Sequence, residues 1–96
     1  MTNRIIFAPR SRRDLEKIHS YLIAETTERA VADGVIVQLL DASDTLKLLP
    51  ERFARYPYAR RWRMMPVGTY LVFFQIREDA VRIGHVRHGA RRPFSG

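Results

Sequence analysis

The chain has 96 residues, contains no cysteine and carries a formal net charge of +7. This length predicts one domain over residues 1–96, and the lack of cysteine excludes disulfides, thiolate nucleophiles and cysteine-based zinc sites. The charge is uneven, because residues 1–50 hold seven basic and seven acidic side chains whereas residues 51–96 hold ten arginines and three acids. A basic half of this kind favours phosphate backbones or acidic proteins as partners, with ordinary solubility charge as the alternative.

The first segment predicts a short strand. Arg4–Ala8 is rich in β-branched and aromatic residues and is stopped by Pro9, a combination typical of a strand end. Its apolar run is too short for a signal peptide. Nor does any window approach the ~20 apolar residues of a membrane span. We therefore expect a cytoplasmic protein that makes no membrane contact.

Two amphipathic helices are predicted next. Ser11 with Asp14 three residues later fits a helix-capping pair. The apolar residues that follow keep a 3.6-residue period, at Leu15, Ile18, Leu22 and Ile23. Thr27 is the predicted cap of a second helix that runs from about Glu28 to Leu49, before Pro50. The apolar stripe of this helix comprises Val31, Val35, Leu39, Ala42, Leu46 and Leu49, with Gln38 beside it.

The second half predicts a three-stranded meander. A proline-bounded loop comes first, in which Phe53, Tyr56 and Tyr58 are expected to seal the end of the helices. The strands are predicted over Arg61–Met64, Tyr70–Ile76 and Val81–His88, separated by turns at Pro66–Thr69 and Arg77–Ala80, and a basic tail occupies about residues 91–96. The order β-α-α-β-β-β predicts an α+β fold, with a helical hairpin on one face of a small, mostly antiparallel sheet.

The sequence resembles the ParE branch of the RelE/ParE toxin superfamily, the toxin halves of bacterial toxin–antitoxin modules. The features that carry the resemblance span nearly the whole chain, and they are Phe7–Pro9, Asp14–Ile18 with Tyr21–Leu22, Leu49–Pro50, Pro66–Phe74 and Val86–Arg91. The most specific of them is the turn and strand Pro-Val-Gly-Thr-Tyr-Leu-Val-Phe-Phe, followed by Val-Arg-His-Gly-Ala-Arg. The superfamily fold that this implies is the same one that the residue pattern predicts.

The resemblance also implies a function. ParE-like toxins are thought to act on DNA gyrase and so to block replication, and a ParD-like antitoxin wraps a helical and extended segment around the toxin to silence it. We therefore expect such an antitoxin as a permanent partner and gyrase as the target, with no sequence-specific contact to nucleic acid. No cofactor is expected. Physical chemistry agrees, because a basic amphipathic domain complements an acidic segment that folds upon binding.

Two alternatives remain open. The first is a ribosome-dependent messenger-RNA endonuclease of the RelE branch. In that branch an arginine precedes the strand tyrosine by four residues, and another often follows it directly. This chain has Pro66 and Leu71 at these two positions. The nucleases also frequently have a tyrosine near the C-terminus, whereas no tyrosine follows Tyr70 here. We therefore expect no enzyme activity. The second alternative is a non-toxic, basic nucleic-acid-binding module.

Six basic residues of the meander and tail are the predicted docking surface for target or antitoxin: Arg61, Arg63, Arg82, Arg87, His88 and Arg91. His85 and His88 are three residues apart on a strand and should point to opposite faces, which argues against a metal pair. His19 lies beside the stripe of the first helix and is expected to be a packed or partly exposed side chain. Trp62, Met64 and Met65 could form a recognition surface, but one of the strand's two faces is expected to pack beneath the helices.

Overall fold

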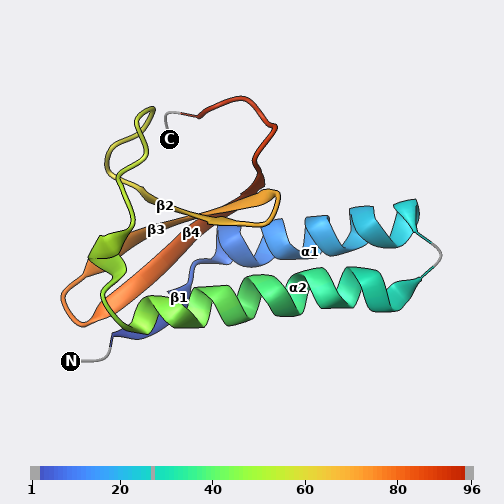
Figure 1. Ribbon diagram of the computed structural model, residues 1–96, viewed down its shortest axis with the longest axis horizontal. Helices are drawn as coiled ribbons and strands as arrows, with labels where there is room; N and C mark the ends of the chain where they lie inside the picture. The colour runs from blue at the N-terminus through green and yellow to red at the C-terminus, as the bar shows by residue number, and fades with distance from the viewer. Residues whose placement is uncertain (1–2, 27, 95–96) are drawn as a thin grey trace.

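The computed structural model describes residues 3–26 and 28–94 and contains two long helices on one face of a four-stranded sheet (Figure 1). The elements are β1 (Arg4–Phe7), α1 (Pro9–Glu25), α2 (Arg29–Asp44), the 3₁₀ turns η1 (Thr45–Lys47) and η2 (Pro50–Arg52), β2 (Arg63–Val67), β3 (Tyr70–Arg77) and β4 (Ala80–His88). The strand order is β1-β4-β3-β2, and only the β1–β4 pair is parallel. The predicted α+β fold is confirmed.

The start of α1 differs from the capping pair that we predicted. The helix begins at Pro9, two residues before Ser11, and Ala8 is its N-cap residue. Proline suits this first position for two reasons. The backbone N–H groups of the first turn have no partner within the helix, so the missing N–H of proline breaks no hydrogen bond, and the fixed φ of proline matches a helix. Ser11 is fully buried, and its hydroxyl donates to the carbonyl oxygen of Ala8 at 2.7 Å.

The end of α2 also differs from the prediction. The helix stops at Asp44 instead of Leu49, and its predicted cap Thr27 lies outside the described residues. Beyond this end, the guanidinium of Arg52 donates to the carbonyl oxygens of Thr45, Leu48 and Leu49. These carbonyls therefore find a partner without continuing the helix. Leu49 has a left-handed backbone, with φ of 47°, and a side chain that is 75% exposed.

The three predicted strands of the meander are confirmed, with a shift in the first of them. Strand β2 begins at Arg63 and continues through Pro66 and Val67, which we had assigned to a turn. Proline is tolerated there because β2 lies at the edge of the sheet, where a missing N–H breaks no ladder. The turn itself is Gly68–Thr69, and Gly68 supplies a positive φ of 57°.

The main core lies between the helices and the sheet. Its buried members are Leu39, Leu46, Met65, Val67, Val72, Phe74, Val81, Ile83 and Val86, and Leu15, Ile18 and Phe53 pack against them. The predicted helix stripes are confirmed only in part, since Ile23, Val31 and Leu49 are exposed. For Ile23 and Val31, which lie near the turn between the two helices, the exposure agrees with Figure 1, where the far half of the helical hairpin projects beyond the sheet.

A second, smaller core covers the opposite face of the sheet. It consists of Tyr56, Ala59, Trp62 and Phe73, with Met64, Leu71 and Phe94 packed against them. One face of the segment therefore packs beneath the helices through Met65, as predicted, whereas Trp62 and Met64 belong to the second core. Of the three aromatic residues expected to seal the helices, Phe53 does so, Tyr56 belongs to the second core and Tyr58 is 63% exposed.

A β-bulge in β4 sets which side chains face each core. Phe73 pairs with His85 and Phe74 with Ile83, so Gly84 has no partner on β3. A Cβ atom at Gly84 would lie 2.2 Å from the Trp62 ring, and only glycine fits there. After this extra residue, Val86 packs in the main core whereas the Arg87 guanidinium lies over Phe94 of the second core.

Candidate functional site

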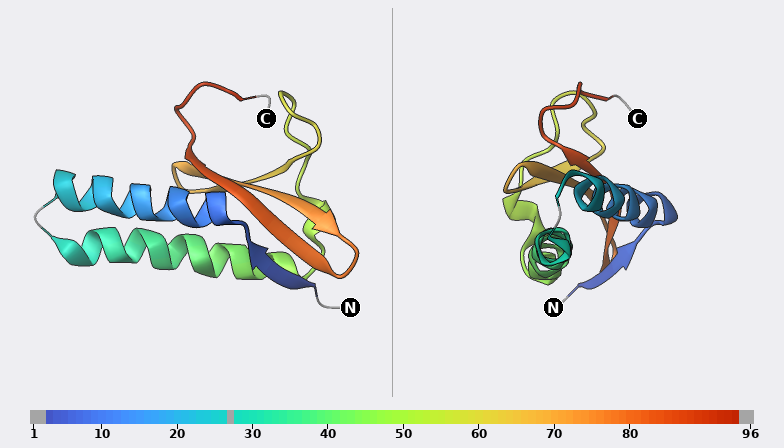
Figure 2. Two further views of the ribbon diagram at one scale, coloured as in Figure 1. Left: turned by 180° about the vertical axis from the view of Figure 1, so that it is seen from behind. Right: turned by 90° about the vertical axis from the view of Figure 1, so that its right-hand side faces the viewer.

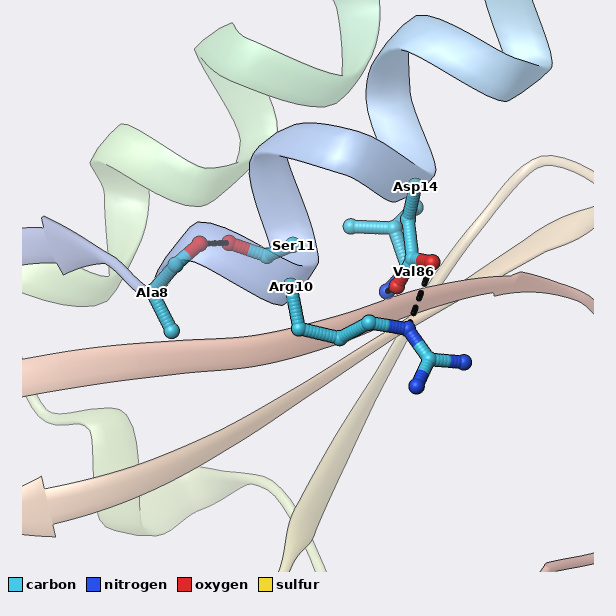
Figure 3. A network of polar contacts seen from close by, with 5 residues as sticks. All are labelled: Ala8, Arg10, Ser11, Asp14 and Val86. Atoms are coloured by element: carbon cyan, nitrogen blue, oxygen red, sulfur yellow. Dashed lines mark hydrogen bonds and ion pairs between the residues drawn. The ribbon is translucent and has the colours of Figure 1, made fainter.

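Asp14 fixes the position of α1 on the sheet (Figure 3). Strand β1 pairs with β4 only as far as Ile83, so the backbone of β4 beyond that point needs another partner. The Asp14 carboxylate supplies it, because one oxygen accepts the backbone N–H of Val86 at 3.0 Å and the other accepts from Arg10 Nε at 3.1 Å. The sequence pattern assigned Asp14 to a helix cap and missed this long-range role.

A groove of about 600 Å³ opens beside this junction, between α1, the β2–β3 turn and the end of β4. Ile18, Leu22, Tyr70 and Val86 give it an apolar floor. Its other lining residues are Asp14, Lys17, Tyr21, Thr69, Arg87, His88 and Arg91. Four of these residues carry basic groups, namely Lys17, Arg87, His88 and Arg91. Asp14 is the one acidic residue in the lining, and both of its carboxylate oxygens already accept hydrogen bonds. The groove is therefore amphipathic, with a basic rim.

Several contacts hold the rim in place. Arg87 lies with its guanidinium carbon 4.6 Å from the centroid of the Phe94 ring, and it donates to the carbonyl oxygen of Arg92 at 2.8 Å. Burial, and after it the nearby Arg91 charge, lowers the pKa of Arg87 from its ordinary value. The guanidinium remains charged, since arginine does not deprotonate in proteins. His88 packs edge-on against Tyr70, with ring centroids 5.4 Å apart.

The six predicted docking residues do not form one surface. Arg87, His88 and Arg91 come together at the groove, whereas Arg61 and Arg63 line a separate hollow near the other end of β3. Arg63 also has a structural role, because it donates to the carbonyl oxygen of Phe53 at 2.8 Å. The sixth residue is Arg82, which pairs in register with Gln75 of β3.

Sequence reasoning missed the helical half of the groove. Ile18 and Leu22 were assigned to the buried stripe of α1, and Lys17 to its solvent side, yet all three line the groove. Tyr21 was noted only as flanking the stripe, and it is 62% exposed. Hydrogen bonding to Glu25 raises the pKa of the Tyr21 hydroxyl. The exposed tyrosine beside an apolar stripe was the one available signal.

The histidines are not arranged as a metal site. His85 and His88 lie on opposite faces of β4, as predicted; the His85 ring centroid is 5.0 Å from that of Trp62, and His88 faces Tyr70. His19 is partly buried and lies 2.7 Å from an Asp33 oxygen. Among residues 3–26 and 28–94, no group of three or more potential ligands is placed to hold a metal ion. Neither helix in this part of the chain has the length and apolar character that a membrane span requires.

These features define a small basic α+β domain with an amphipathic groove. The chain belongs to the ParE toxin family, since the family model described as the ParE toxin of the type II toxin–antitoxin system parDE matches residues 5–93. No curated protein sequence matches it.

Two solved structures share the fold. A chain of the chromosomal ParDE toxin–antitoxin system from P. aeruginosa superposes with a TM-score of 0.80 at 11% identity, over 91% of this chain and 96% of that one. A conserved hypothetical protein from Helicobacter pylori gives a TM-score of 0.57 at 15% identity, over 95% and 98% of the two chains. The RelE/ParE-like fold that the sequence predicted is thus confirmed.

Proposed function

We propose that this protein is the toxin of a ParDE-type module, that a ParD-like antitoxin silences it by occupying the groove, and that the free toxin inhibits DNA gyrase. Membership of the ParE family supports the first part. The second part, silencing by an antitoxin, is supported by the groove, which combines an apolar floor with a basic rim.

The groove suits an acidic, amphipathic segment that becomes ordered when it binds. Apolar side chains of such a segment would be removed from water against Ile18, Leu22 and Tyr70, which is the main source of binding free energy. Its carboxylates would meet Lys17 and Arg91 at the rim, which steers the encounter and fixes the orientation of the partner. The paired carboxylate of Asp14 offers little repulsion, since Arg10 neutralises it.

The antitoxin part of the proposal is tested by reversing one charge at the rim. Arg91→Glu places a negative charge at the groove, and we expect roughly tenfold weaker binding to the antitoxin encoded by the neighbouring gene. Arg12→Glu is the matched control, because it makes the same charge change at an exposed position of α1 that does not line the groove. Isothermal titration calorimetry measures both. Equal losses in the two variants would contradict a role for the groove.

The proposed action on gyrase is not enzymatic. Two apolar side chains stand where the nuclease branch has arginines, and these residues, Pro66 of β2 and Leu71 of β3, are direct cross-strand partners. The aromatic residue near the C-terminus is Phe94, which packs against Tyr56 and Phe73 and has no proton to transfer. This arrangement supports binding of a target over phosphodiester cleavage by general acid and base groups.

A pair of assays tests the target. Purified toxin is added to a gyrase supercoiling reaction, where we expect loss of supercoiling and accumulation of cleaved DNA, both reversed by the antitoxin. In parallel, the toxin is added to a cell-free translation system, where intact messenger RNA is expected. Transcript cleavage that disappears in Arg61→Ala or Arg91→Ala, together with unaffected gyrase, would instead establish the endonuclease alternative.

A further inference from the structure

The molecule has a second basic concavity that the groove does not use. It is a hollow of about 180 Å³ lined by Arg55, Arg61, Arg63, Gln75, Ile76 and Arg77. Tyr70 of the groove and Ile76 of the hollow are six residues apart on β3, which at the usual rise of a strand separates them by about 20 Å. The two sites are therefore distinct.

Neutral groups hold three of the four arginines of the hollow in position, namely Arg55, Arg63 and Arg77. Arg55 Nη1 donates to the carbonyl oxygen of Arg60 at 3.1 Å, and Arg63 Nη1 donates to that of Phe53 at 2.8 Å. Arg77 Nη2 donates to the side-chain oxygen of Gln75 at 2.8 Å. These bonds fix the side chains and leave other guanidinium N–H groups for a ligand, because each arginine has five donors.

The hollow carries positive charge without a counter-charge in its lining. None of its lining residues is acidic, and no ion pair within the described part of the chain involves Arg55, Arg63 or Arg77. The neighbouring Arg82 adds to the positive potential, since it is the cross-strand partner of Gln75. Like charges that line one hollow repel one another, and a bound anion relieves the repulsion.

The composition of the hollow distinguishes between anionic ligands. A protein segment that folds on a partner gains most of its free energy from apolar contacts, and Ile76 is the one apolar residue in the lining. A phosphate group needs no such contact, because guanidinium forks match its oxygens directly. We infer that this arginine hollow binds the phosphodiester backbone of duplex DNA, independently of base sequence and of any action on gyrase.

Fluorescence anisotropy with the full-length toxin and a labelled duplex of arbitrary sequence tests the inference. The variant Arg55→Gln/Arg77→Gln removes two charges from the hollow. We expect roughly tenfold weaker binding at moderate salt, and a slope of log K against log salt reduced by about 2, since each lost phosphate contact changes it by ~0.9. A double lysine variant, Arg55→Lys/Arg77→Lys, should retain most of the affinity because it keeps the charge.

The matched control is Arg12→Gln/Arg13→Gln, which removes the same two charges from exposed positions on α1. An equal loss of affinity and slope in this control would overturn the inference, because binding would then reflect net charge alone. Circular dichroism melts establish that all variants are folded. If the Arg55→Gln/Arg77→Gln variant loses DNA binding but still inhibits gyrase, the result supports a DNA site that is separate from the action on gyrase. The DNA-binding measurement can therefore succeed or fail independently of the gyrase assay.

A competition experiment separates phosphate from carboxylate as the ligand. Inorganic phosphate and a polyglutamate peptide are each titrated into the complex of toxin and duplex at matched ionic strength. Displacement by phosphate, with none by polyglutamate at the same concentration of charged groups, supports the inference. Equally effective displacement by polyglutamate would overturn it and assign the hollow to an acidic protein segment.

Discussion

Asp14 is the residue on which the geometry of the groove depends most directly. Its carboxylate joins α1 to β4 at Val86, and both elements contribute groove residues. Replacement by alanine would leave a buried backbone N–H without an acceptor, a loss of about 1–3 kcal/mol. The same change also removes the partner of Arg10.

We therefore expect Asp14→Ala to lower the free energy of unfolding by about 2 kcal/mol in urea denaturation. Glu16→Ala is the control, since this carboxylate is exposed two residues further along the same helix, and changes at such positions usually stay within about 0.5 kcal/mol. Similar losses in the two variants would show that the bond to Val86 is not a significant stabilising contact.

His85 makes stability depend on pH. Burial, and then the charge of Arg10, lowers the pKa of His85 below its ordinary value, and its Nδ1 atom is buried without a hydrogen-bond partner among the described residues. The unfolded chain therefore takes up a proton near pH ~6.5, before the folded protein does. Stability rises with pH wherever the unfolded state binds more protons.

The free energy of unfolding should thus fall as pH decreases from 7.5 through 6.5 towards the lower pKa of folded His85. His85→Phe removes the titrating group and keeps an aromatic ring beside Trp62 and Phe94, so its stability should change less over the same interval. Urea denaturation at pH 7.5 and 5.5 measures both proteins. An identical pH dependence in the two would exclude His85 as its source.

At the scale of elements, two glycines in different environments give a matched pair. A Cβ atom at Gly84 of β4 would overlap the buried Trp62 ring, whereas one at Gly34 of α2 would meet nothing within 4 Å. Gly84→Ala should destabilise the protein by about 1–3 kcal/mol, because the Trp62 ring must move. Gly34→Ala should stabilise it by about 0.5–1 kcal/mol, since alanine favours the helix.

Thermal or urea unfolding of the two glycine variants measures this difference. The opposite signs make the comparison informative, because both substitutions add the same methyl group. A stable Gly84→Ala protein with unchanged Trp62 fluorescence would show that the bulge does not require glycine.

The elements themselves could largely be predicted from the sequence. Period-2 and period-3.6 patterns are local, and they located all four strands and both helices to within a few residues. The helix and strand ends that we predicted wrongly depend on contacts between distant residues or on the position of a strand in the sheet. Arg52 binds backbone carbonyls of the segment that follows α2, from Thr45 to Leu49, and Pro66 is accepted in β2 because that strand lies at an edge.

The candidate site could be predicted only in part, for the same physical reason. The basic residues Arg87, His88 and Arg91 were recognised because their charge is a local property. Their apolar partners on α1 look like ordinary core residues, and only the tertiary fold leaves one side of Ile18 and Leu22 open to the groove. The bulge at Gly84, which sets the faces of β4, gives no signal in a single sequence.

At the scale of the whole molecule, packing is uneven along the longest axis. The central strands β3 and β4 lie between two cores, whereas the far half of the helical hairpin projects beyond the sheet (Figures 1 and 2). The exposed apolar residues Tyr21, Ile23 and Val31 lie in this projecting part. Segments with little buried apolar surface open with low free energy.

Hydrogen exchange measured by mass spectrometry should therefore show slow exchange in β3 and β4 and much faster exchange in the projecting part of α1 and α2. The difference is expected because amides in the projecting part of the hairpin can exchange through local opening, whereas amides of the central strands exchange only when the whole protein unfolds. Uniform protection along both helices would contradict it. Occupation of the groove by an antitoxin should slow exchange in α1 first, because Ile18, Tyr21 and Leu22 line it.

The parallel pairing of β1 with β4 has a consequence for the synthesis of the protein. Arg4 pairs with Ala80, and Phe7 with Ile83, so the first strand has no partner until the last one has been translated. Contacts so distant in sequence form late, because closing a long loop costs entropy before any contact repays it. The wall of the groove, from Val86 to Arg91, is also made last. A nascent chain that stops before Ala80 therefore lacks both the complete sheet and the wall of the groove.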